Sequence, residues 1–113
     1  MNENSKEFLF IFGFEDPIEF EGNKENETDF ESSRAIWILA QNPNEALQWG
    51  KIFAEKYVSE IFAEAGVTGY SWGDSKFAYW IEEHPESIAD VSTLERIPKV
   101  RVGHYALPND FDR

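Results

Sequence analysis

Two short and almost wholly apolar segments constrain the fold of this chain more than any other feature of its sequence. Phe8–Phe14 reads FLFIFGF and Arg34–Ala40 reads RAIWILA. Successive side chains of a strand point to opposite faces of its sheet, so both faces of each segment are apolar. Such strands occur inside sheets that are covered on both sides. We therefore predict two inner strands that need one covering layer on each face.

The segment after the second strand predicts one of these layers. Asn42–Pro43 is typical of an N-cap followed by the first position of a helix, and Glu45 stands at the spacing of a capping box. Gly66 suits the left-handed residue that ends a helix, and apolar residues recur in between at steps of three and four. This pattern predicts a helix over about 43–65. Gly50 lies inside it at a cost of about 1 kcal/mol relative to alanine, so we expect the helix to approach the sheet closely there.

Two further strands complete the predicted fold. Lys76–Glu83 and Lys99–Leu107 have strand-like composition. We expect the first of these strands to end before Pro85, because proline has no N–H to donate to a ladder. A length of 113 residues is typical of one domain. We predict a single α+β domain over residues 1–113, an antiparallel four-stranded sheet with one long helix packed on one face, in the order ββαββ.

Acidic residues are concentrated between the two apolar segments. The chain holds 22 acidic and 10 basic residues, a net charge of −12, and residues 15–31 contain eight of the acids and one lysine. Same-parity residues share one face of an extended backbone, so we predict an acidic hairpin arm or loop at about 15–31. Its odd-numbered carboxylates form the candidate partner-binding ridge: Glu15, Glu19, Glu21, Glu25, Glu27, Asp29 and Glu31.

This ridge favours a basic protein as the partner, because clustered negative charge steers positive surfaces toward it. The alternative interpretation is a solvated segment that only aids solubility and shields strand edges. The negative charge argues against nucleic acid and anionic membranes as partners. The segment does not match the pattern of a calcium loop, and no dinucleotide or phosphate-binding motif is present. We expect no metal and no cofactor.

Aromatic residues make up 16% of the chain, and some of them remain uncovered if the helix packs on one face of the sheet. A large open aromatic patch is unusual for a monomer, and aromatic residues are preferred anchors of interfaces. We therefore predict a homodimer through the helix-free face, with a ligand cleft there and in loop 67–75 as the alternative. The candidate ligand or interface aromatics are Trp37, Tyr70, Trp72 and Trp80.

A hydrolase-like motif lies in the same loop. Gly69–Gly73 (GYSWG) fits G-x-S-x-G, and Asp90 and His104 follow in the order of the hydrolase triad. That motif needs a turn from strand to helix, whereas here a helix precedes and a strand follows. His84 has two glutamates before it, but two histidines without fixed spacing are a weak signal for a metal or a base. We assign no catalytic residue, and a non-enzymatic role is favoured.

The favoured function is a non-enzymatic acidic module that docks a basic protein partner, for example in a toxin-neutralising or regulatory role. The alternative is a small-molecule-binding domain or a modest enzyme that uses an aromatic cleft on the helix-free face and the 67–75 loop.

The chain has no cysteine, which excludes disulfides and thiolate sites. No apolar run approaches the roughly 20 residues that span a bilayer, and Met1–Glu7 lacks the order of a secretory signal. We expect a cytoplasmic location.

Overall fold

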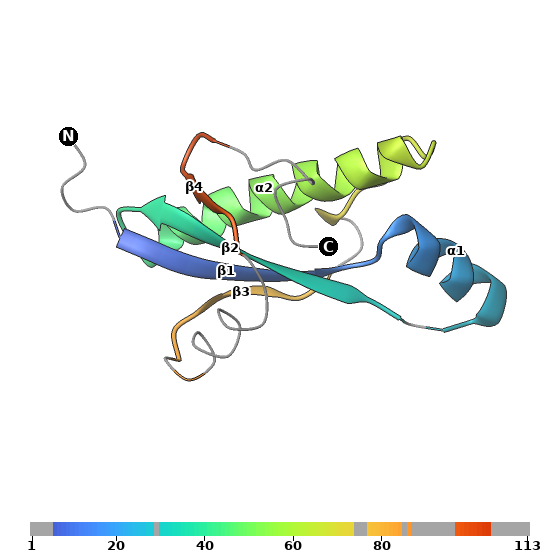
Figure 1. Cartoon of the computed structure of the whole chain (residues 1–113), viewed down its shortest axis with the longest axis horizontal. Helices are drawn as coiled ribbons and strands as arrows, with labels where there is room; N and C mark the ends of the chain where they lie inside the picture. The colour runs from blue at the N-terminus through green and yellow to red at the C-terminus, as the bar shows by residue number, and fades with distance from the viewer. Residues whose placement is uncertain (1–5, 29, 74–76, 85, 87–96, 105–113) are drawn as a thin grey trace.

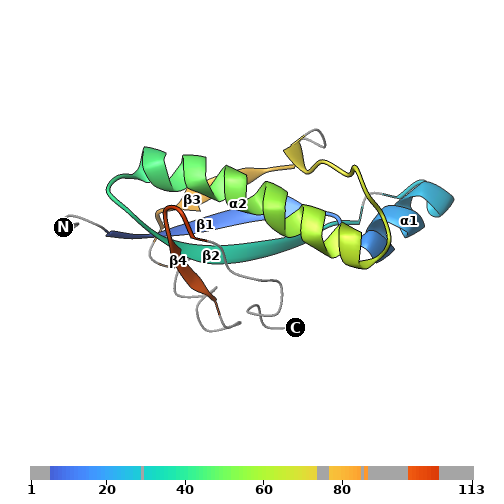
Figure 2. The ribbon, with the colours of Figure 1, turned by 90° about the horizontal axis from the view of Figure 1, so that it is seen from above.

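The computed structural model describes residues 6–28, 30–73, 77–84, 86 and 97–104, which form a layer of helix on a four-stranded sheet. Helix α2 lies across one face of the sheet, and helix α1 lies beyond one end of it (Figures 1 and 2). The α+β class is therefore confirmed. The elements are β1 (Lys6–Phe14), α1 (Pro17–Asn26), β2 (Ser32–Ala40), α2 (Pro43–Glu64), β3 (Tyr79–Glu82) and β4 (Lys99–Arg101).

Strands β1 and β2 are the two inner strands, as their composition predicts. The sheet order is β3-β1-β2-β4, and β1 and β2 pair antiparallel along their whole length. Phe10 and Phe12 of β1 are buried on the α2 side, and Leu9 and Ile11 are buried on the opposite side. Both faces of β1 are thus covered, which confirms the prediction from its apolar sequence.

The sheet is mixed, so the prediction of an antiparallel sheet is wrong. Strand β3 pairs antiparallel with β1, but β4 pairs parallel with β2 at the other edge. The 16 residues from 83 to 98 are long enough for the crossover that such a placement requires, whereas a short hairpin would have forced antiparallel neighbours. Both outer strands are also shorter than predicted. Gly103 has a φ of +95° in the turn just after β4, and Lys76 and Leu107 lie outside the described residues.

Residues 17–26 form helix α1, so the predicted hairpin arm or loop is wrong at this position. The carboxylate of Asp16 accepts a hydrogen bond from the Glu19 main-chain N–H at 2.7 Å. The Glu19 carboxylate accepts one from the Asp16 N–H at 3.0 Å, which completes a capping box with Pro17 at the first helical position. Over the described residues the element order is therefore βαβαββ, with two helices rather than one.

Helix α2 has the predicted bounds to within one residue. The side chain of Asn42 accepts a hydrogen bond from the Glu45 N–H at 2.8 Å, and Gly66 has a φ of +84° just beyond the last turn. A Cβ atom built on Gly50 would lie within 2.6 Å of atoms of the Phe10 ring. The predicted close approach of the helix to the sheet is thus confirmed, and the Phe10 ring fills the space that Gly50 leaves.

Aromatic rings make up much of the core between α2 and the sheet. The ring of Phe12 has edge-on neighbours in Phe53, Tyr57 and Trp72, with centroid distances of 6.2, 5.8 and 6.1 Å. Such pairs contribute about 0.5–1.5 kcal/mol beyond the burial of their surface. Among the residues that the structure describes, neither helix is long and apolar enough to cross a bilayer.

Candidate functional site

The predicted acidic ridge falls on α1 and the residues that flank it, and it divides into two groups. Glu15 and Glu19 make hydrogen bonds within the chain. Glu15 accepts hydrogen bonds from Asn23 Nδ2 at 2.7 Å and from the Tyr70 hydroxyl at 3.4 Å. Glu19 belongs to the capping box and also accepts from the Ser32 hydroxyl at 3.0 Å. Asp29 lies outside the described residues. The exposed group is Glu21, Glu25, Glu27 and Glu31.

One side chain attaches α1 to the core. The ring of Phe20 packs edge-on against Phe62 and Tyr70, with centroid distances of 5.4 and 5.3 Å. Asn23 anchors the chain after the helix, because its amide group donates to the Phe30 carbonyl and accepts from the Phe30 N–H. Nothing in the sequence pattern indicated this role of Asn23, because a single polar residue in an acidic segment carries no periodic signal.

The side of α1 away from Phe20 faces solvent. Ile18, Glu21 and Glu25 are three and four residues apart, so they share one face of the helix. Ile18 is 84% exposed, and the helix contains no buried residue. Phe30, just after the helix, is 69% exposed. This face therefore combines an exposed apolar side chain with carboxylates along one stripe.

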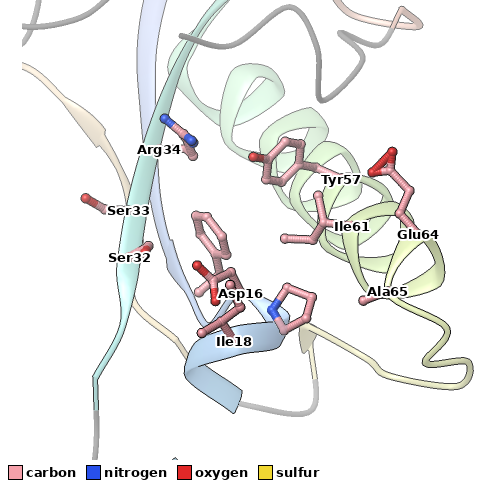
Figure 3. A pocket seen from close by; sticks show the side chains of 11 residues that line it. Asp16, Ile18, Ser32, Ser33, Arg34, Tyr57, Ile61, Glu64 and Ala65 are labelled. Carbon is pink, nitrogen blue, oxygen red and sulfur yellow. The ribbon is translucent and has the colours of Figure 1, made fainter. Parts of the chain in front are cut away.

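A cleft of about 730 Å³ opens beside this stripe, between the start of α1, the start of β2 and the C-terminal half of α2 (Figure 3). Its volume is in the range of ligand-binding pockets. The lining combines apolar side chains with two carboxylates, three hydroxyls and one guanidinium among the described residues. Its members are Phe14, Asp16, Pro17, Ile18, Ser32, Ser33, Arg34, Tyr57, Ile61, Glu64 and Ala65.

The four candidate aromatics do not come together. Trp72 is only 4% exposed, and its indole N–H donates to the Gly13 carbonyl at 2.8 Å, so it is part of the core. Tyr70 stacks on Phe62 at a centroid distance of 3.8 Å on the same side of the sheet. Trp37 and Trp80 lie on the opposite side. The predicted cleft on the helix-free face therefore does not include the aromatic residues of loop 67–75.

The helix-free face is largely covered within one chain. Leu9, Ile11 and Ala35 are buried there, with Trp37 and Ile97 packed against them. Trp80, at 41%, is the more exposed of the two tryptophans on this face. The homodimer stays a prediction, and the aromatic patch that suggested it is smaller than expected.

The G-x-S-x-G loop is held by a carboxylate rather than prepared for catalysis. Glu55 of α2 accepts hydrogen bonds from the Ser71 hydroxyl at 3.0 Å and from the main-chain N–H groups of Trp72 and Gly73 at 2.8 and 2.9 Å. Ser71 therefore binds a carboxylate where a hydrolase would place a histidine. Asp90 lies outside the described residues. No signal in the sequence pointed to Glu55.

The candidate metal ligands do not come together either. Within the described part of the chain, no group of three or more His, Asp or Glu residues could hold a metal ion. His84 is exposed, and its main-chain N–H donates to Glu82 at 3.3 Å. Two hydrogen bonds lower the pKa of the Glu82 carboxyl group: the larger effect comes from the Trp80 indole and the smaller one from the His84 N–H. These contacts stabilise the end of β3.

Comparison with known proteins finds no protein-family model, no curated protein and no solved structure that matches this chain. The cleft, the exposed face of α1 and the charge around them are therefore the features that a proposed function has to explain. Figure 1 shows α1 beyond one end of the sheet, and the cleft borders the start of this helix through Asp16, Pro17 and Ile18.

Proposed function

We propose that this protein is a non-enzymatic interaction module that docks a basic protein partner through the exposed face of α1. The observation that carries the proposal is Ile18, which is 84% exposed on a helix with no buried residue and shares its face with Glu21 and Glu25. Protein interfaces commonly combine apolar anchors with a charged and polar rim. A helix that contributes so little to the core is available for such a contact.

The distribution of charge supports a basic partner. Residues 15–31 carry a net charge of −7, out of −12 for the whole chain. Charge of one sign on an exposed surface attracts an oppositely charged protein over about 8 Å at physiological salt and accelerates its association. Carboxylates on α1 would compete with phosphate groups for a basic surface. A toxin-neutralising or regulatory role toward a nucleic-acid-processing protein is the concrete form of the proposal.

The competing proposal, a small-molecule site or enzyme built on loop 67–75, receives less support. Trp72 and Tyr70 are used in internal packing, and Ser71 is bound to Glu55. These side chains position the loop on α2. We therefore favour docking over catalysis.

A pair of charge-matched double variants tests the proposal. Glu21→Gln with Glu25→Gln removes two carboxylates from α1, and Glu83→Gln with Glu86→Gln removes two exposed carboxylates outside it. The probe is a fluorescently labelled oligolysine peptide, and its affinity is measured by anisotropy at physiological salt. We expect the α1 variant to bind about fivefold more weakly than wild type, as two exposed charge pairs of about 0.5 kcal/mol each imply.

The control variant should lose much less affinity, because its charges lie outside the docking surface. If both double variants weaken binding equally, only the net charge of the protein attracts the peptide. That result would contradict a docking role for α1. Circular dichroism of both variants verifies that the helices are retained.

A further inference from the structure

We propose that the cleft beside α1 receives a large apolar side chain of the partner, so that the docking segment is a short basic sequence with one apolar residue in its middle. This inference rests on the proposed function and adds the chemistry of the partner to it. The cleft borders α1 directly, because Pro17 and Ile18 of that helix line it together with Ile61 of α2 and Ala65, the C-cap of α2. Docking on α1 therefore places a partner over the cleft.

The lining favours an apolar group inside the cleft. Phe14, Pro17 and Ile18 supply an apolar surface from the first part of the chain. Ile61 of α2 and its C-cap Ala65 supply another. Ile18 stands at the exposed edge of this surface. A cleft of about 730 Å³ is large enough to hold a Leu-sized side chain together with its neighbouring backbone. Burial of that side chain and of Ile18 removes apolar surface from water on both partners.

The charges around the cleft favour basic residues on either side of the apolar one. Asp16 and Glu64 line the cleft, while Glu21 and Glu25 follow along the exposed face of α1. Arg34 is the one basic side chain among the described lining residues, and Figure 3 shows it on the β2 side, across the cleft from Glu64. Lysine or arginine side chains of a partner would therefore lie toward α1 and α2. A second copy of this chain, with its charge of −12, fits this surface poorly.

Two labelled peptides test the inference, Lys-Lys-Leu-Lys-Lys and Lys-Lys-Ser-Lys-Lys, which differ only in their central side chain. We expect the 113-residue chain to bind the leucine peptide about tenfold more tightly, because an apolar side chain is transferred from water to the cleft. Anisotropy titrations at low salt measure both affinities. Equal affinities would assign the cleft to a small molecule or to nothing, and would overturn the inference.

A matched pair of cleft variants locates the effect. Ala65→Phe fills the cleft, whereas Ala63→Phe places the same side chain at a position that is not part of the cleft lining. Both alanines are exposed, so neither substitution disturbs the core. We expect Ala65→Phe to reduce the tenfold preference for leucine to about one and Ala63→Phe to leave it unchanged. A preference that survives Ala65→Phe would overturn the inference.

The two proposals fail in different ways. If the leucine preference is absent while the α1 double variant still binds oligolysine more weakly than its control, the cleft proposal is wrong and the docking role of α1 stands. If neither peptide binds at low salt, the basic partner itself is contradicted, and the cleft proposal falls with it.

Discussion

The ring of Phe10 occupies the space in which a side chain at position 50 would lie, so Gly50 determines how closely α2 approaches β1. Alanine normally stabilises a helix interior by about 1 kcal/mol relative to glycine. We nevertheless expect Gly50→Ala to lower the free energy of unfolding by about 1–3 kcal/mol, because the added methyl group overlaps a buried ring. Urea denaturation measures this change.

Gly22 provides the matched control, because it also lies inside a helix but a Cβ there would meet nothing within 4 Å. Gly22→Ala should raise the free energy of unfolding by about 0.5–1 kcal/mol. If Gly50→Ala proves as stabilising as Gly22→Ala, the close packing of α2 on Phe10 is refuted.

The Glu82 carboxylate makes part of the stability dependent on pH. Its pKa is lowered chiefly by the Trp80 indole hydrogen bond and then by the His84 N–H. The resulting stabilisation is present above the ordinary pKa of 4.5 and is lost as the pH falls through the lower folded value. We expect Trp80→Phe to be slightly less stable than wild type at neutral pH, with the difference vanishing in acid. Thermal melting across this range tests it, and an equal difference at every pH would argue against the hydrogen bond.

At the scale of the element, α1 ends at a residue whose backbone suits glycine better than glutamate. Glu27 is the C-cap, with φ +54° and ψ +45°, whereas Glu25 lies inside the helix. A left-handed conformation costs a residue with a Cβ atom about 1 kcal/mol, and glycine inside a helix costs about as much. We therefore expect Glu27→Gly to stabilise α1 and Glu25→Gly to destabilise it, by about 1 kcal/mol each.

The two variants remove the same charge from positions two residues apart, so each is a control for the other. Amide hydrogen exchange within α1 measures the local stability of the helix directly. Effects of the same sign would mean that the segment does not end as a helix at Glu27. An extended arm or a loop would then describe it better.

The difference between the two helices explains why only one was predicted. Helix α2 has signals at both ends, Asn42 and Gly66, and its apolar residues repeat between them. Helix α1 begins with an equally good signal at Asp16 and Glu19, but it has no apolar repeat because it buries no residue. The alternation of its carboxylates suggested an extended arm. In a helix of 3.6 residues per turn, Glu21 and Glu25 share one face, whereas Glu19 points away from them.

Among the strands, too, some could be predicted from the sequence and others could not. The apolar sequences of β1 and β2 identify buried inner strands by themselves, whatever the arrangement of the other elements. Strands β3 and β4 have four and three residues, and their pairing depends on which edge of the sheet the connecting segment reaches. Nothing in Lys99–Arg101 itself distinguishes a parallel from an antiparallel neighbour. The mixed sheet could therefore not be predicted from local sequence.

At the scale of the whole molecule, charge could be predicted but shape could not. The acidic segment is visible in the composition, yet the walls of the cleft come from α1, β2 and α2, which only the fold brings together. The same is true of Trp72 and Gly13, which are 59 residues apart and share a buried hydrogen bond. The sequence therefore made Trp72 a candidate for a ligand site or an interface, whereas the fold places it in the core.

The most direct test of a docking surface at this end of the molecule is an NMR titration of the isotope-labelled chain with Lys-Lys-Leu-Lys-Lys at low salt. We predict that the largest amide shift changes fall on Ile18 and Glu21 of α1, on Ile61 of α2 and on its C-cap Ala65, with β3 unaffected. Largest changes on β3 or β4, or no changes at all, would contradict this account.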